Sequence, residues 1–141
     1  MERKTFVSMK AVILNERNEL LIVQESANDP SRSHVGKWDV PGGRLEFGED
    51  PVEGLKRELK EEVGAEVEVL EPLDLSYWTP KKNGEEWYVV AVFVRCRINS
   101  ESVKVSNFEH GAFKWVKKEE LDQYTIIPST KSALGRVWED G

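Results

Sequence analysis

Residues 43–65 read GRLEFGEDPVEGLKRELKEEVGA, and they contain the clearest helix signal in the chain. Asp50 can cap a helix N-terminus, and Pro51 suits the first helical position, where its missing N–H is not needed. Gly64 is a residue that commonly follows the last helical turn. We therefore predict a helix that begins at Pro51 and ends near Val63.

This predicted helix has one apolar face and one acidic face. On a wheel of about 100° per residue, the apolar positions fall within an arc of about 80° that would pack on a sheet, and they are Val52, Leu55, Leu59 and Val63. Glu58, Glu61 and Glu62 form the second face at spacing i, i+3, i+4. Like charges placed in this way repel by about 0.2–0.5 kcal/mol per pair. Neither Lys56 nor Lys60 shares their arc.

The acidic face has two interpretations. The three glutamates are ordinary surface residues, because Glu is a good helix former, or they surround a cation. The preceding segment, Pro41-Gly42-Gly43, favours the cation, because it is expected to turn and its backbone can approach a ligand closely. Carboxylate oxygens are hard ligands that favour Mg²⁺ or Mn²⁺.

Strand signals surround this helix on both sides. The expected strands are Thr5–Leu14, Leu20–Gln24, Trp38–Val40, Val67–Trp78, Trp87–Ile98 and Ala112–Val116. The polar stretch 15–18 predicts a turn, so that the first two strands should form a hairpin. A final helix is expected over Ser129–Trp138. Many strands with a few helices predict an α/β (α+β) fold, a mixed sheet flanked by helices.

The composition of the chain argues against several classes of protein. A chain of 141 residues can bury a core without a metal or disulfide staple, and we expect one domain over residues 1–141. With 26 acidic and 20 basic residues, the chain is unsuited to coating DNA or RNA. Its longest apolar run, residues 89–94, is too short to span a bilayer, and the N-terminus lacks a signal core. Cys96, the lone cysteine, is compatible with a reducing compartment. We expect a cytoplasmic protein without a nucleic-acid or membrane partner.

The same stretch of sequence resembles the signature of the Nudix hydrolase superfamily. That signature is Gly, five residues, Glu, seven residues, then Arg-Glu-apolar-any-Glu-Glu-any-Gly-apolar, and its fixed positions are held here by Gly43, Glu49, Arg57, Glu58, Leu59, Glu61, Glu62 and Gly64. Ala65 is small for the last apolar place. Residues 36–42 and 113–121 also resemble segments of the family. The resemblance implies a Nudix-type α/β/α sandwich with the signature box at 43–65.

The resemblance also implies a reaction and a set of residues. The family uses water and a divalent metal, Mg²⁺ or Mn²⁺, to split a nucleoside diphosphate linked to another group. Carried onto this sequence, the metal ligands are the backbone carbonyl of Gly42 and the side chains of Glu58, Glu61 and Glu62. Glu58 is a further ligand or the general base. Arg57 would hold the glutamates in place and would itself be steadied by Glu49.

A further metal carboxylate often comes from a loop beyond the box, and Glu109 is the expected one here. Glu85, Glu86 and Glu101 are the alternatives, with less resemblance to support them. Several relatives carry an Arg at the end of the second strand, where this chain has Glu25. Phosphate contacts would then fall to the metal or to Arg32, Lys37 or Arg44. Trp78 and Tyr77 are the candidates for stacking on a base.

Three functions are compared. The first is a MutT-type pyrophosphohydrolase that converts a nucleoside triphosphate to the monophosphate and pyrophosphate, with cleansing of the nucleotide pool as a role. The second is an ADP-ribose or other nucleoside-diphosphate-X pyrophosphatase, because members of that subgroup often carry a proline about 15 residues past the box, where Pro80 stands. The third is a nucleotide sensor without catalysis. The partner is a small-molecule nucleotide in each case. The sequence does not decide whether the protein forms a homodimer.

Overall fold

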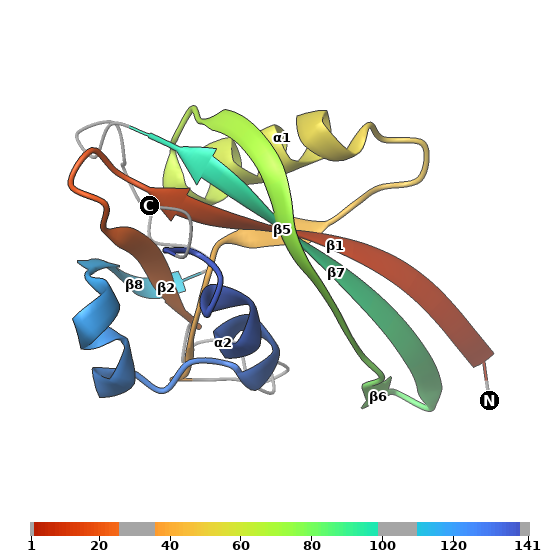
Figure 1. The fold of residues 1–141 in the computed structure, drawn as a ribbon. Coiled ribbons are helices and arrows are strands. Elements are labelled where there is room, and N and C mark those ends of the chain that lie inside the picture. The colour runs from red at the N-terminus through yellow and green to blue at the C-terminus, as the bar shows by residue number, and fades with distance from the viewer. Residues whose placement is uncertain (1, 26–35, 99–109, 139–141) are drawn as a thin grey trace.

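The computed structural model describes residues 2–25, 36–98 and 110–138 (Figure 1). The strands are β1 (Glu2–Leu14), β2 (Leu20–Glu25), β3 (Trp38–Asp39), β4 (Gly42–Arg44), β5 (Glu68–Trp78), β6 (Lys81–Lys82), β7 (Glu85–Arg97) and β8 (His110–Val116). The helices are α1 (Pro51–Val63), the 3₁₀ helix η2 (Lys118–Gln123) and α2 (Pro128–Leu134). Among the described residues, no helix is both long and apolar enough to cross a membrane.

Strand β1 is the centre of a mixed sheet. It runs parallel to β7 along its whole length, from Glu2 opposite Glu85 to Leu14 opposite Arg97. On its other edge β1 pairs antiparallel with β4 and, at Leu14, with β2. Strand β5 pairs with β7, while β3 and β8 pair with β2. The prediction of a mixed sheet with a few helices is confirmed.

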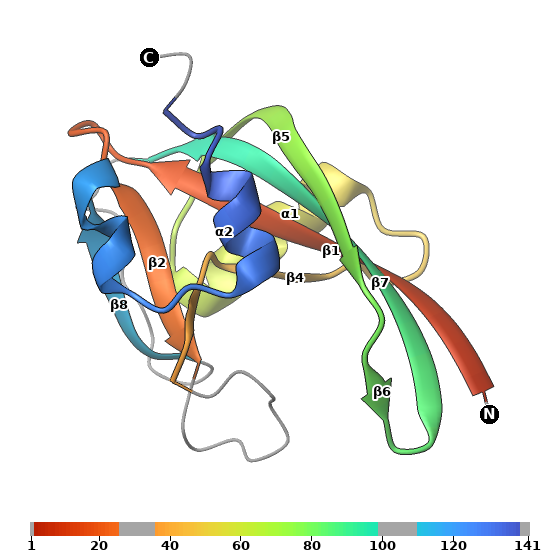
Figure 2. The same ribbon diagram turned by 60° about the horizontal axis from the view of Figure 1, so that its bottom comes forward.

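The helices lie on opposite faces of this sheet (Figure 2). Side chains alternate along β1, so that Ala11 and Ile13 join Leu55 and Leu59 of α1 in one buried cluster. Val12 and Leu14 join a second buried cluster with α2, which includes Phe93, Ala133, Leu134 and Val137. Two cores separated by one sheet make the α/β/α sandwich that the resemblance implied.

Several local predictions hold. The 15–18 turn joins β1 to β2, and the buried Asn15 side chain organises it by accepting hydrogen bonds from the N–H groups of Arg17 and Glu19. The last helix was predicted over Ser129–Trp138, and α2 is shorter because it ends at Leu134, immediately before Gly135.

Two expectations about the signature region are wrong. Gly42 and Gly43 do not form a turn, since they lie in β4 and pair with Lys10 and Met9 of β1. A Cβ atom at Gly42 would lie 2.1 Å from the carbonyl oxygen of Met9, so glycine is what permits this close pairing. Val52 is the second error, because it is 42% exposed and only Leu55, Leu59 and Val63 of the predicted apolar face are buried. Its place in the first helical turn lies beyond the part of α1 that the sheet covers.

A buried ion pair connects three parts of the fold. Lys10 Nζ of β1 lies 2.7 Å from Asp39 Oδ2 of β3, and both side chains are largely shielded from solvent. The Thr130 hydroxyl of α2 donates to Asp39 Oδ1 at 2.6 Å, as does the N–H of Val40 at 2.7 Å. Each charge therefore has partners, which is the condition for keeping an ion pair out of water.

We predict that Asp39→Asn lowers the free energy of unfolding by about 3–5 kcal/mol, because it leaves the charge of Lys10 buried without a counter-ion. Urea denaturation at neutral pH measures this. Asp122→Asn is the matched control, since Asp122 is 92% exposed and lies 4.0 Å from Lys131, and it should cost less than about 1 kcal/mol. Equal losses in the two variants would show that the Lys10–Asp39 pair contributes no more than a surface contact.

Candidate functional site

The helix that carries the acidic face has both of its predicted ends. The Asp50 side chain accepts hydrogen bonds from the backbone N–H groups of Val52 at 2.9 Å and Glu53 at 3.1 Å, which satisfies two of the free donors at the helix start. Gly64 follows the last residue with φ of 63°, a left-handed conformation that glycine adopts without strain. These local signals set where along α1 each glutamate lies.

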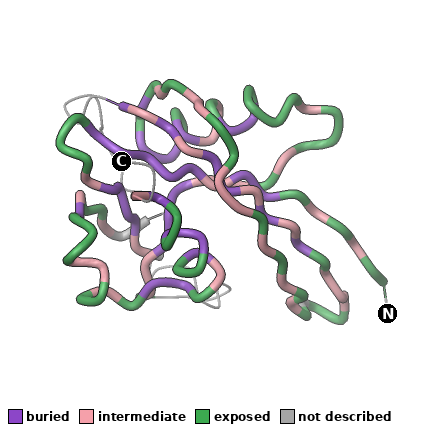
Figure 3. The backbone as a smooth tube through the Cα atoms, viewed as in Figure 1, coloured by how far each residue is buried: buried purple, intermediate pink, exposed green. Residues whose placement is uncertain are grey.

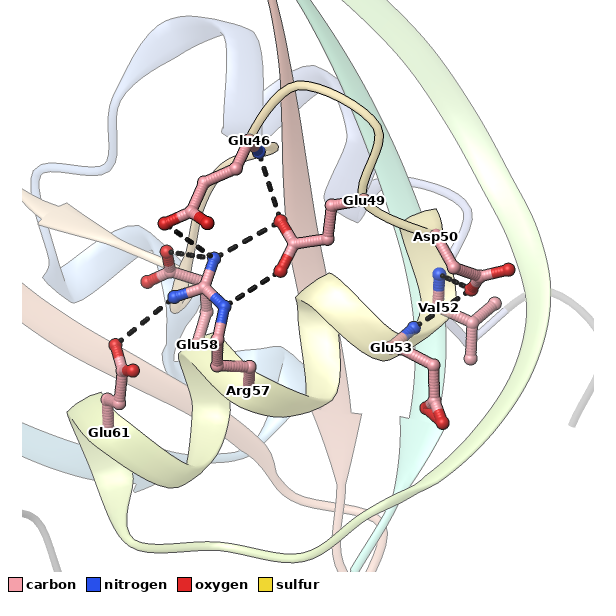
Figure 4. A network of polar contacts seen from close by, with 8 residues as sticks. All are labelled: Glu46, Glu49, Asp50, Val52, Glu53, Arg57, Glu58 and Glu61. Atoms are coloured by element: carbon pink, nitrogen blue, oxygen red, sulfur yellow. Dashed lines mark hydrogen bonds and ion pairs between the residues drawn. The ribbon is translucent and has the colours of Figure 1, made fainter.

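Arg57 joins four carboxylates around the N-terminal half of α1 (Figure 4). Its guanidinium makes a two-armed contact with Glu49, with Nε donating to Oε2 at 2.8 Å and Nη2 to Oε1 at 3.2 Å. It also lies 3.2 Å from Glu58 and 3.3 Å from Glu61. Glu49 is fixed further by the N–H of Glu46, which donates to its Oε1 at 3.0 Å.

The charges in this network support one another. Hydrogen bonds from Arg57 and from the Glu46 backbone hold the pKa of Glu49 below its ordinary value. The same Glu49 contact raises the pKa of Arg57, so that the guanidinium keeps its charge. The structure thus brings Arg57 and Glu49 together in the geometry that an orienting role requires.

Glu58 and Glu62 lie against the backbone of β4. The N–H of Gly42 donates to Glu62 Oε2 at 3.4 Å, and Glu62 is buried. A Cβ atom at Gly43 would lie only 2.6 Å from the carboxyl carbon of Glu58, so the absence of a side chain there makes room for this carboxylate. Strand β4 and the middle of α1 therefore place two acidic groups and a glycine backbone in one spot.

This pair of carboxylates is electrostatically unfavourable by itself. Burial raises the pKa of Glu58 to about 7, and the neighbouring charge of Glu62 adds to the rise, while Arg57 acts against it. A divalent cation between the two groups would relieve both effects. Mg²⁺ and Mn²⁺ prefer oxygen donors, and the carboxylates of Glu58 and Glu62 supply them. The missing side chain at Gly43 leaves room beside them, so these residues fit such an ion.

The three glutamates of the predicted acidic face do not converge on one point. Glu61 is 63% exposed at its side chain and contacts Arg57 through Nη1, whereas Glu58 contacts the same guanidinium through Nη2 (Figure 4). Across residues 2–25, 36–98 and 110–138, no three His, Cys, Asp or Glu side chains are grouped as a metal would need. Glu109, the expected further carboxylate, lies outside the described residues, as does its alternative Glu101.

The other sequence-predicted residues are dispersed. Arg44 stacks over the Phe6 ring at 4.2 Å and lies 5.4 Å from the Trp87 ring, at the β1–β4 pairing. Lys37 is half-buried just before β3, and Arg32 is outside the described part of the chain. Trp78 is half-buried and packs against the cluster under α2.

The alternatives to Glu109 at the start of β7 are engaged elsewhere. Glu85 lies 2.7 Å from Lys4, and Glu86 lies 2.9 Å from Arg3, at the far N-terminal end of β1. Neither therefore supplements the Glu58–Glu62 pair.

Sequence reasoning missed two contributors near this site. Glu46 helps to fix Glu49 through its backbone N–H, which no side-chain pattern could indicate. The Lys10–Asp39 pair lies beside Gly42, since Lys10 is the β1 partner of Gly42. A usable signal existed for Asp39, a carboxylate within a short apolar strand segment between Trp38 and Val40.

Comparison with known proteins gives a consistent result. The family model described as NUDIX domain matches residues 4–134. A MutT-like protein of Streptomyces ambofaciens is 32% identical over 117 residues, which cover 83% of this chain and 67% of that protein. The nucleoside triphosphatase NudI of Escherichia coli is 30% identical over 109 residues, with 70% of this chain and 74% of that protein covered. In three further relatives the aligned stretch covers only 21%, 30% and 17% of the longer protein.

A solved structure agrees in fold along nearly the whole chain. The crystal structure of a MutT protein from Methanosarcina mazei Go1 superposes with a TM-score of 0.78 at 26% sequence identity. The superposition covers 99% of this chain and 97% of that one.

The raised pKa of Glu58 predicts a pH-dependent stability for the metal-free protein. Between the ordinary value of 4.5 and about 7, the folded state binds a proton that the unfolded state has released, so stability falls as pH rises through this interval. Thermal unfolding in the presence of a chelator measures the effect. Glu58→Gln should flatten the fall, while Glu53→Gln, an exposed change on the same helix, should keep it. Parallel pH profiles for the wild type and Glu58→Gln would contradict the shift.

Proposed function

This chain belongs to the Nudix family, and from that premise we propose that it is a Mg²⁺- or Mn²⁺-dependent pyrophosphohydrolase of nucleoside triphosphates. The products are the nucleoside monophosphate and pyrophosphate, and cleansing of the nucleotide pool is the role. The observation that carries the proposal is the Glu58–Glu62 pair, held against the Gly42–Gly43 backbone with the pKa of Glu58 raised to about 7. Residues 1–141 act as one catalytic domain in this proposal.

Glu58, Glu61 and Glu62, together with the Gly42 carbonyl, are the proposed metal-holding groups, and Glu109 is proposed to join them. When bound, the metal neutralises phosphate oxygens and lowers the pKa of a coordinated water. Glu58 is also the proposed general base, since its carboxylate lies among the proposed metal-holding groups and a carboxylate can accept the proton of an attacking water. No covalent nucleophile is required.

Arg57 is a positioning residue in this proposal. Its planar fork contacts Glu49 with two nitrogens while its remaining donors reach Glu58 and Glu61, which a lysine ammonium cannot reproduce. The orientations of the Glu58 and Glu61 side chains therefore both depend on Arg57. Glu49 fixes the guanidinium from the other side.

Support for a triphosphate substrate comes from a relative named for it, the nucleoside triphosphatase NudI. Phosphate contacts are assigned to Arg32, Lys37 or Arg44, and base stacking to Trp78. The rival substrate, ADP-ribose or another nucleoside-diphosphate-X compound, rested on Pro80. That residue lies in the connection before β6, a place where proline is common in turns, and its carbonyl accepts a hydrogen bond from the N–H of Trp87. We propose a cytoplasmic location and a nucleotide as the partner, without DNA or RNA.

We predict that Glu62→Gln weakens Mg²⁺ binding and lowers turnover by orders of magnitude, because a charged oxygen ligand becomes a neutral amide. Turnover is measured at limiting Mg²⁺, and Mg²⁺ binding is measured separately as the increase in melting temperature. Circular dichroism confirms that the variant is folded. Glu53→Gln, on the exposed first turn of α1, is the matched control and should behave as the wild type. Undiminished turnover of Glu62→Gln would remove this residue from the site.

The reaction itself is tested in ¹⁸O-labelled water with a panel of nucleoside triphosphates and ADP-ribose. We expect label in a single product after one turnover, because water attacks phosphorus directly, and we expect monophosphate plus pyrophosphate rather than diphosphate plus phosphate. Mass spectrometry of the products identifies the phosphorus attacked. Faster cleavage of ADP-ribose to AMP and ribose phosphate would select the rival substrate with the same metal chemistry. If neither class is cleaved with Mg²⁺ or Mn²⁺, the protein is a nucleotide-binding module.

A further inference from the structure

The N-terminal halves of β1 and β7 extend away from both helices (Figures 1 and 2). We call this extension the arm, and define it as residues 2–7 of β1, residues 75–78 of β5, strand β6 and residues 85–90 of β7. Its two long strands pair in parallel from Glu2–Glu85 to Val7–Val90. Neither α1 nor α2 reaches it, so its side chains must find cover in another way (Figure 3).

One face of the arm is covered by the chain itself. Phe6 and Trp87 meet edge to face with ring centroids 4.8 Å apart, and the Arg44 guanidinium lies over both rings. These contacts cover the aromatic rings of that face with groups of the same molecule.

The opposite face of the arm is apolar and open. It is formed by Val7, Leu75, Tyr77 and Tyr88, which are 37%, 67%, 64% and 46% exposed. We call it the tyrosine face. The side chains are contiguous, because Val90 of β7 is paired with Val7 on one side and with Tyr77 on the other. Tyr77 and Tyr88 stack with centroids 5.6 Å apart at an interplanar angle of 22°.

The tyrosine face continues the surface on which α1 packs. Met9 lies two residues beyond Val7 on the same side of β1 and is buried in the cluster under α1. The helix covers that half of the sheet face and leaves the other half exposed. An exposed apolar patch of this size is often functional.

We propose that the tyrosine face is the interface of a homodimer, in which two copies of this chain pack their arms face to face about a two-fold axis. A two-fold contact places the same patch on both sides, and a flat apolar patch is complementary to itself. The four side chains present roughly 400 Å² of surface, taking a whole aromatic side chain as about 150–250 Å². A standard interface buries about 800 Å² per partner, about 65% of it apolar in homodimers. The patch therefore supplies most of the apolar area that a dimer needs.

The charges of the chain favour this surface for self-association. The whole chain carries a net charge of −6, which repels a second copy. Residues 2–7 and 81–90 together hold four basic and three acidic residues by sequence, so the arm lacks the acidic excess. The ion pairs Arg3–Glu86 and Lys4–Glu85 neutralise its rim locally.

The exposed edge of the sheet is a poorer contact than its face. Strand β5 lies at the end of the strand order, and it carries Glu68, Glu71 and Asp74 along with Pro72. Like charges and a proline that cannot donate a hydrogen bond oppose pairing of β5 with its own copy. The two copies are therefore expected to stack by their faces and not to pair through β5.

Sedimentation equilibrium over a wide range of concentrations tests the proposal. The wild-type protein should be a dimer, and Tyr77→Glu or Tyr88→Glu should raise its dissociation constant by roughly 30-fold or more, the size expected for a central aromatic residue. Tyr77→Ser, which adds no charge, should weaken the dimer in the same direction. Circular dichroism and thermal unfolding show that each variant is folded.

Phe113→Glu is the matched control. Phe113 of β8 is an aromatic residue of similar exposure, at 40%, and it lies on a strand remote from the arm. Its change to Glu should leave the dimer intact. A wild-type protein that sediments as a monomer at every concentration would overturn the proposal. So would dissociation by Phe113→Glu equal to that of the tyrosine variants.

Discussion

The close contact between the Gly42–Gly43 backbone and its surroundings is the constraint on which the rest of the structure depends. A side chain at Gly42 would collide with the Met9 carbonyl of β1, and one at Gly43 would collide with the Glu58 carboxylate of α1. Because Gly42 has no side chain, β4 can pair with the central strand, and because Gly43 has none, the Glu58 carboxylate can lie against its backbone. The fold and the candidate site are thus produced by the same contact.

The candidate site combines a stable part with an unfavourable part. Arg57 and Glu49 form a two-armed pair whose charges reinforce each other, and this pair contributes order to the loop before α1. Glu58 and Glu62 are packed together with burial raising the pKa of Glu58, an arrangement that costs stability unless a cation is present. Such unfavourable groups on a rigid support are typical of functional sites.

The sheet itself is covered unevenly. Where α1 and α2 lie over β1, its alternate side chains enter two separate cores. Beyond the helices the same alternation continues into the arm, where one face is covered by Arg44 and the other is left to the tyrosines. The strand pattern is therefore continuous, while the partner that buries each side chain changes along the strand.

The sequence by itself determined what depends on neighbouring residues. Asp50, Pro51 and Gly64 set the bounds of α1, because capping and helix termination involve groups within one turn of the chain. The spacing of the signature likewise placed Arg57 one to four residues from Glu58 and Glu61. Tertiary structure decided the rest. The pairing of Gly42 with Lys10, the burial of Asp39, the separation of Glu61 from Glu62 and the exposure of Val52 all depend on contacts between distant segments, and no local pattern encodes which segments will meet.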